Sequence, residues 1–130
     1  HLSDGYDLML YILRRQDGSV DVASGTLVEP NGRTRNIGHG EMAIDVTRRW
    51  RSPESGALYP SRWRIRIPSR NIDLEVESLV ANQELLTKES TGVTYWEGVV
   101  AGKGWSGGRT VTCEGYVELT GYAGSLKGVF

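Results

Sequence analysis

An alternation of apolar and charged side chains across residues 63–77, WRIRIPSRNIDLEVE, constrains the fold of this chain more than any other feature. Apolar residues fill every second position on both sides of PSRN. The positions between these apolar residues are arginines before PSRN and acidic residues after PSRN. This period of two is typical of strands with one buried face. A turn centred on Ser69 and Arg70 predicts the cross-strand pairs Arg66–Asp73, Arg64–Glu75 and Arg62–Glu77. Each exposed pair contributes only about 0.2–1 kcal/mol, but a slip of one residue would bury all six charges, so we expect this register.

The rest of the chain also favours strands. Turn signals at Asp17-Gly18 and Asn31-Gly32 separate short apolar runs, and no stretch of a dozen residues keeps a helical period. Further strands are expected over residues 6–14, 20–28, 42–48, 80–86, 95–100 and 111–122. Seven or eight antiparallel strands in sequence order predict an all-β meander that closes into a barrel or folds into a sandwich. A barrel of about eight strands has room inside for one small ligand.

Composition excludes several classes of function. The 130 residues suffice for one domain, and 15 basic against 16 acidic residues leave no basic surface for nucleic acid. Apolar runs such as residues 8–13 are too short to cross a bilayer, and no basic and apolar leader opens the sequence. The single cysteine, Cys113, cannot form an internal disulfide and is expected to be a small buried side chain. With two histidines, we expect no metal.

Two glycine- and proline-containing segments are expected to be loops. Residues 50–63, WRSPESGALYPSRW, carry Trp50, Tyr59 and Trp63, which either line a pocket at the barrel mouth or pack the loop against the barrel. Residues 101–114 contain four glycines, Gly102, Gly104, Gly107 and Gly108. No helix signal follows them, so a flexible hairpin loop is expected there rather than a phosphate site.

Glutamates interrupt the apolar pattern of the last strands. In YWEGVV, Glu97 follows Trp96, and the two must face opposite sides of a regular strand. In GYVELTGY, Glu118 shares a face with Tyr116 and Tyr122. Either this face lies outside, or it lines a ligand cavity in which desolvation raises the pKa of the carboxyl group. Glu84, in NQEL, could likewise be a buried acid or could fix a loop by a hydrogen bond.

Four motifs in order, WRSPESGALYPSRW, NQEL, YWEG and GYVELTGY, resemble the carotenoid 1,2-hydratase family. That family, also called hydroxyneurosporene synthase, includes AttH-like proteins and fungal hydratases and cyclases. Its members pair two lipocalin-like barrels, and this chain resembles the C-terminal one. The resemblance implies a single lipocalin-like barrel domain over residues 1–130, with a companion N-terminal domain or self-association. It also weakly favours a periplasmic or secreted location.

The resemblance implies a cofactor-independent hydratase or isomerase acting on a carotenoid or terpenoid-like molecule. A protonated Glu97, Glu118 or Glu84 would deliver a proton to a carbon–carbon double bond, aromatic faces would stabilise the cation, and water would add last. The expected ligand-binding residues are aromatic: Trp50, Tyr59, Trp63, Tyr95, Trp96, Tyr116 and Tyr122. The alternative is a non-catalytic module that binds an apolar ligand or assists export, as AttH-type proteins do. Trp105, Tyr116 and Tyr122 are candidates for an exposed partner surface.

Overall fold

The computed structural model describes residues 1–87 and 92–123, and almost all of its regular structure is antiparallel strand. The strands described are β1 (Asp7–Arg14), β2 (Val20–Val28), β3 (Thr34–Ile37), β4 (Ala43–Arg51), β5 (Leu58–Ile67), β6 (Ile72–Ser78), β7 (Glu84–Leu86), β8 (Thr94–Ser106) and β9 (Arg109–Leu119). Two short 3-10 turns, η1 (His39–Glu41) and η2 (Pro68–Arg70), precede β4 and β6. In the part of the chain described, no helix is long and apolar enough to span a bilayer.

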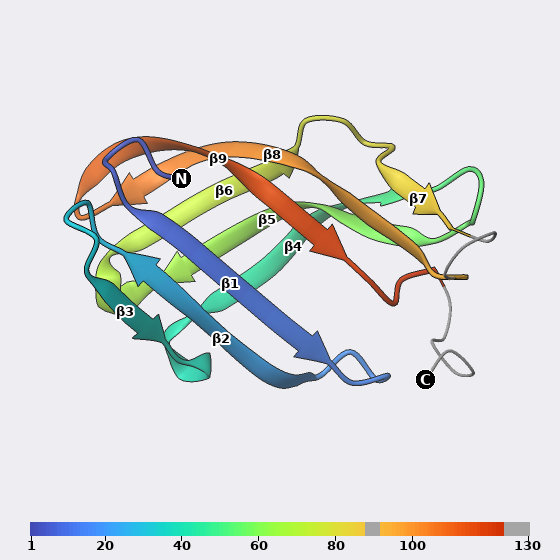
Figure 1. Ribbon diagram of the computed structural model, residues 1–130, viewed down its shortest axis with the longest axis horizontal. Helices are drawn as coiled ribbons and strands as arrows, with labels where there is room; N and C mark the ends of the chain where they lie inside the picture. The colour runs from blue at the N-terminus through green and yellow to red at the C-terminus, as the bar shows by residue number, and fades with distance from the viewer. Residues whose placement is uncertain (88–91, 124–130) are drawn as a thin grey trace.

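The strands form two sheets that face each other (Figure 1). One sheet has the order β1-β2-β3, and the other contains β4 to β9, with β4, β5, β6 and β8 as neighbours in that order. Strand β9 pairs along one edge of β8, so β6 and β7 share the other edge. A bridge between Leu2 and Cys113 attaches the N-terminal segment to β9. The all-β, lipocalin-like class is therefore confirmed, although the described strands form two sheets rather than one closed ring.

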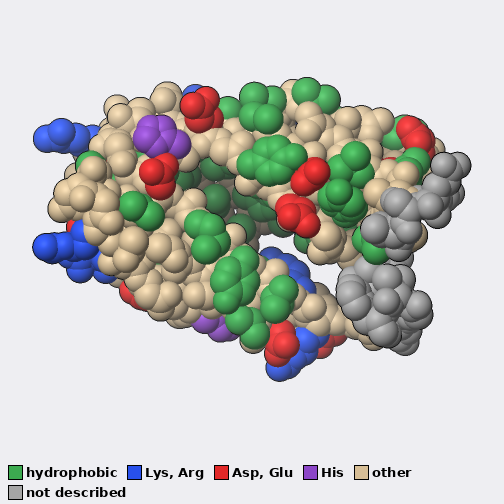
Figure 2. Space-filling view, viewed as in Figure 1, with side chains coloured by type: hydrophobic (Ala, Val, Ile, Leu, Met, Phe, Trp, Pro, Cys, Tyr) green, Lys and Arg blue, Asp and Glu red, His purple; other side chains and the backbone are tan. Residues whose placement is uncertain are grey.

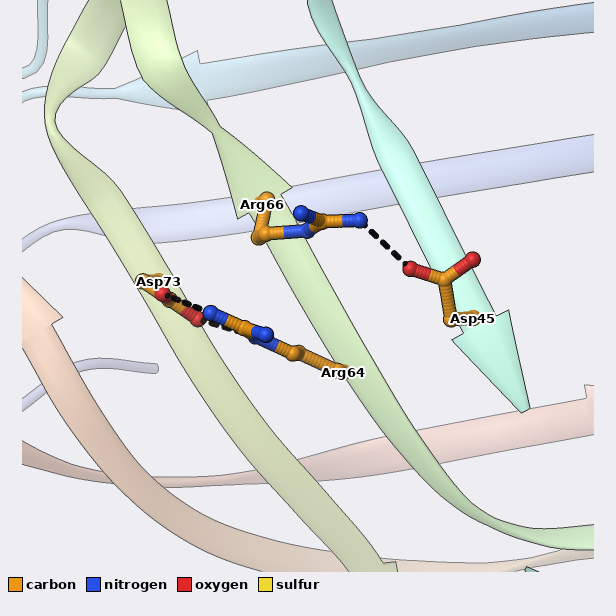
Figure 3. A network of polar contacts seen from close by, with 4 residues as sticks. All are labelled: Asp45, Arg64, Arg66 and Asp73. Carbon is orange, nitrogen blue, oxygen red and sulfur yellow. Dashed lines mark hydrogen bonds and ion pairs between the residues drawn. The ribbon is translucent and has the colours of Figure 1, made fainter. Parts of the chain in front are cut away.

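The hairpin of β5 and β6 has the predicted register. Arg66 lies opposite Asp73, Arg64 opposite Glu75 and Arg62 opposite Glu77. The ion pairs, however, run diagonally: Arg64 binds Asp73 through two hydrogen bonds of 3.1 and 2.8 Å, and Arg66 reaches Asp45 on β4 at 2.8 Å (Figure 3). The alternating charges thus form a solvated network across three strands, as expected for an outer face.

The hydrophobic core lies between the two sheets. Figure 2 shows a hollow between them in which hydrophobic side chains are visible. The other faces of the same strands carry the charged network and most of the exposed side chains. The buried cluster comprises Leu2, Leu27, Ile37, Ala57, Tyr59, Trp63, Ile67, Ile72, Leu74, Val76, Trp96, Val100, Val111 and Leu119.

Both expected loops are shorter than predicted. Strand β4 extends to Arg51 and β5 begins at Leu58, so Trp50, Tyr59 and Trp63 lie on strands rather than on a loop. Tyr59 and Trp63 belong to the core. Their burial favours the packed alternative over a mobile lid.

The glycine-rich segment is mostly strand and not a flexible loop. Only Gly107 and Gly108 form the turn, both with positive φ. Gly102 and Gly104 lie inside β8, where a Cβ atom would come within 2.0 Å of the carbonyl oxygens of Glu75 and Asp73 respectively. These two glycines are therefore required by the close approach of β6, which sequence alone did not indicate.

Candidate functional site

Glu84 is the centre of a hydrogen-bonded cluster at one end of the β4-to-β9 sheet. Its carboxylate accepts hydrogen bonds from the hydroxyl groups of Ser52 at 2.6 Å, Ser55 at 2.5 Å and Tyr59 at 2.7 Å. Glu84 pairs with Trp96, so its side chain is on the inner face of the sheet. Of the three glutamates predicted to act as acids, Glu84 is the one that points inward.

The cluster keeps Glu84 ionised. Partial desolvation raises the pKa of its carboxyl group, but the three donated hydrogen bonds lower it more, and the net pKa lies below the ordinary value for glutamate. Burial and the bond to Glu84 together raise the pKa of Tyr59, which stays a neutral donor. At neutral pH this arrangement is a fixed carboxylate acceptor, not a proton donor.

Aromatic rings extend the cluster. The ring of Tyr59 stacks on Trp50 with a centroid distance of 6.2 Å and meets Tyr122 at 5.8 Å. Trp96 is buried beside the cluster, and its indole N–H donates to the carbonyl oxygen of Ala81 at 2.8 Å. Four of the predicted ligand-binding aromatics therefore gather here, while Trp63 is buried further along β5.

The other two glutamates lie on the opposite face of the sheet. The buried residues of β9 include Val111 and Leu119, so Glu118 faces outward and is exposed. Glu97, half-buried, lies directly opposite Glu118 on β8. These two carboxylates therefore do not line a cavity between the sheets, because the apolar face of both strands packs against the core.

Tyr95 and Tyr116 accompany this glutamate pair. Tyr116 is 62% exposed, and its pKa is raised by desolvation, by the charge of Glu97 and by a hydrogen bond to that carboxylate. Val99 lies directly opposite Tyr116, and Leu85 lies opposite Tyr95. Figure 2 shows acidic side chains among hydrophobic ones over β8 and β9. We call Leu85, Tyr95, Glu97, Val99, Tyr116 and Glu118 the outer carboxylate patch.

The structure thus divides the predicted site into two parts on opposite faces of one sheet. Sequence reasoning missed Ser52 and Ser55, although both stand in the SPES stretch of a motif that had been singled out. Within the described residues, no group of three or more histidine, cysteine or acidic side chains has the geometry to hold a metal ion. A separate cavity of about 360 Å³, lined in part by Tyr6, Leu27 and Arg70, contains none of the predicted site residues.

Comparison with known proteins agrees with this architecture. The AttH-like family model matches residues 1–122. The crystal structure of an AttH protein from Nitrosomonas europaea is 33% identical, with a TM-score of 0.80, and the match covers 93% of this chain and 36% of that one. Kievitone hydratase from Nectria haematococca is 21% identical, with a TM-score of 0.73 and coverage of 94% and 36%, and this likeness shows the fold alone.

Among curated proteins no match was found. This chain spans about a third of the length of the two solved chains, since 36% of each is covered. The family model, in contrast, extends from residue 1 to residue 122 and so includes both parts of the candidate site. The chain belongs to the AttH-like family.

Proposed function

We propose that this chain is one domain of a cofactor-independent hydratase or isomerase for an apolar polyene or terpenoid, with its acid in the outer carboxylate patch. The observation that carries the proposal is the pairing of Glu97 directly opposite Glu118. Like charges in directly opposed positions destabilise a sheet, so this arrangement has a cost in the free chain. A catalytic use of the pair would explain why both positions are acidic.

Covering the patch changes the chemistry of the pair. In the proposed reaction an apolar substrate or a companion domain excludes water from the patch. One glutamate of the pair then acts as the general acid and the other as the general base. In the free chain Glu118 is exposed and Glu97 is half-buried, so the proposed reaction requires this covering surface.

The pair can then complete a balanced hydration. The neutral carboxyl group gives its proton to one carbon of the double bond, and the tertiary cation formed lies against the faces of Tyr95 and Tyr116. Water attacks the cation and loses a proton to the second carboxylate. The net change is the addition of one water molecule, and the pair again holds one proton.

The name of kievitone hydratase, a protein with the same fold, supports hydration as the reaction type. The second candidate function is a non-catalytic AttH-like module that binds an apolar ligand. It is favoured by Glu84, the inward-facing acid, whose lowered pKa makes it a poor proton donor. Carotenoid hydration in particular rests on the sequence resemblance alone.

The experiment is incubation with an acyclic carotenoid or terpenoid, with and without a matching companion domain, followed by mass analysis for one added water. The variants Glu97→Gln and Glu118→Gln should each lower turnover about 100-fold or more, the scale of a lost general acid or base. Glu114→Gln is the matched control because Glu114 is exposed on the same face of β9. Ligand binding without product, unchanged by any of the three substitutions, would instead establish the non-catalytic function.

A further inference from the structure

Trp105 is an exposed aromatic residue that the proposed reaction does not use. Its side chain is 54% exposed on the outer face of β8, whereas Trp63 and Trp96 are buried and Trp50 is half-buried. Trp105 lies near the β8–β9 turn, eight residues from Glu97. At about 3.3 Å per residue along a strand, this separates it from Glu97 by roughly 26 Å.

Polar side chains surround Trp105 in two rows across three strands. Asp73 on β6 and Thr110 on β9 lie directly opposite Trp105, and Glu75 and Thr112 lie directly opposite Lys103. Side chains of directly paired residues share a face of the sheet. With Arg64 and Ser3, these residues line a groove of about 690 Å³.

The groove presents fixed and free hydrogen-bonding groups. The two bonds between Arg64 and Asp73 hold a planar ion pair along one wall (Figure 3). Lys103 makes no ion pair with any residue that the structure describes. Likewise, no hydrogen bond within residues 1–87 and 92–123 engages the hydroxyl groups of Thr110 and Thr112. Donors and acceptors are thus available around the exposed indole ring.

The charge of the groove selects among ligands. Arg64 and Lys103 balance Asp73 and Glu75, so the groove lacks the excess positive charge that a nucleic acid requires. Its many polar groups would be left desolvated and unpaired under a purely apolar ligand. A sugar ring matches both features, since its C–H face packs on an indole ring and its hydroxyl groups donate and accept hydrogen bonds.

We propose that this groove binds a neutral carbohydrate, with one pyranose ring stacked on Trp105. The hydroxyl groups of the sugar form hydrogen bonds with Lys103, Thr110 and Thr112. A protein partner fits less well, because protein interfaces surround their tryptophans with apolar contacts. Here the exposed apolar residues Val99 and Tyr116 lie on the other half of β8 and β9.

The test is titration of the chain with cellohexaose, maltohexaose and chitohexaose, followed by calorimetry and by the indole N–H resonances of the four tryptophans. At least one hexaose should bind with a Kd of about 10 µM to 1 mM and shift the Trp105 resonance most. Trp105→Ala should weaken that binding about 10-fold or more, and Thr110→Val about 3-fold. Tyr11→Ala, an exposed aromatic substitution on the other sheet, is the matched control and should leave the Kd unchanged.

Three results would overturn the carbohydrate proposal. The first is the absence of binding by all three hexaoses at about 10 mM. The second is a Kd that Trp105→Ala does not change, with the variant shown to be folded by circular dichroism. The third is a sedimentation mass of two chains that Trp105→Ala restores to one, since Trp105 would then be a contact between copies.

Discussion

Removing the carboxylate of Glu84 should destabilise the fold by an amount that can be worked out from its partners. Ser52 is 2% exposed and Tyr59 is fully buried, so both hydroxyl groups would lose their acceptor without gaining water. Each buried polar group left unsatisfied costs about 1–3 kcal/mol, and the more exposed Ser55 adds little. Glu84→Ala should therefore lower the free energy of unfolding by about 2–6 kcal/mol. Glu84→Gln, which keeps one acceptor oxygen, should lower it by about 1–2 kcal/mol.

Urea and thermal unfolding followed by circular dichroism at pH 7 measure these losses. For a domain of this size about 1 kcal/mol corresponds to roughly 3–5 °C in Tm, so Glu84→Ala should unfold about 6–30 °C below the wild type. Glu54→Gln is the matched control because Glu54 is an exposed glutamate of the neighbouring loop. Its Tm should stay within about 2 °C of the wild type.

The pH dependence gives an independent check with a defined sign. Because the folded pKa of Glu84 lies below the unfolded value near 4.5, its contribution is complete above that pH and disappears as pH falls through the folded pKa. The stability difference between wild type and Glu84→Gln should stay constant from about pH 7 to 5.5 and shrink below about pH 4.5. A difference that widens in acid, or a Glu84→Ala variant within about 0.5 kcal/mol of the wild type, would refute the assignment of Glu84 as an ionised anchor.

Four further outcomes can be measured on the same chain. Gly104→Ala should cost about 2 kcal/mol or more in urea unfolding, because its Cβ would meet the Asp73 carbonyl oxygen at 2.0 Å. Arg64→Ala should cost less than about 1 kcal/mol, since the exposed pair with Asp73 contributes little. Burial raises the pKa of the Cys113 thiol, so a disulfide reagent should modify it slowly at pH 8 and rapidly only in urea. Glu118→Gln should raise the stability of the free chain by about 0.2–1 kcal/mol through relief of like-charge repulsion, and a loss instead would contradict the repulsive pair.

Local chemistry was sufficient to predict the hairpin of β5 and β6. The period of two sets the buried face, and arginines before the turn match acids after it in one register only. The turn is closed by Asn71 with a φ of 55°, within the PSRN segment that had been expected to reverse the chain. The same reasoning correctly placed the strand over residues 20–28, which is β2.

The two loop predictions were wrong because glycine and proline usually indicate a loop, although both occur within strands here. Pro60 lies inside β5, where a proline normally argues against a strand, but the β4–β5 register shifts beside Arg48 and Arg49, and such an irregularity tolerates a missing N–H. Gly102 and Gly104 signal flexibility when read locally. Their actual role depends on how closely β6 approaches, which is a property of the assembled sheet.

The Glu84 cluster could not be assembled from sequence, because its donors lie 32, 29 and 25 residues from the carboxylate. The WRSPESGALYPSRW and NQEL motifs contain all four members, yet nothing in either motif indicates that the two segments meet. The sequence also did not decide which face of the sheet carries Glu97 and Glu118, for a different reason. Both faces of β9 carry side chains that could be buried, and only the core decides between them.

The positions of these groups bear on where chemistry can occur in this fold. Tyr59, Trp63 and Trp96 occupy the space between the sheets, and the acid among them is held ionised by its three donors. The Glu97–Glu118 pair, whose like charges repel each other, and the exposed Trp105 lie instead on the outer face of β8 and β9. Since a protein retains unfavourable pairs and exposed aromatics mainly where they are used, the outer face of β8 and β9 is where a substrate or companion domain should be sought.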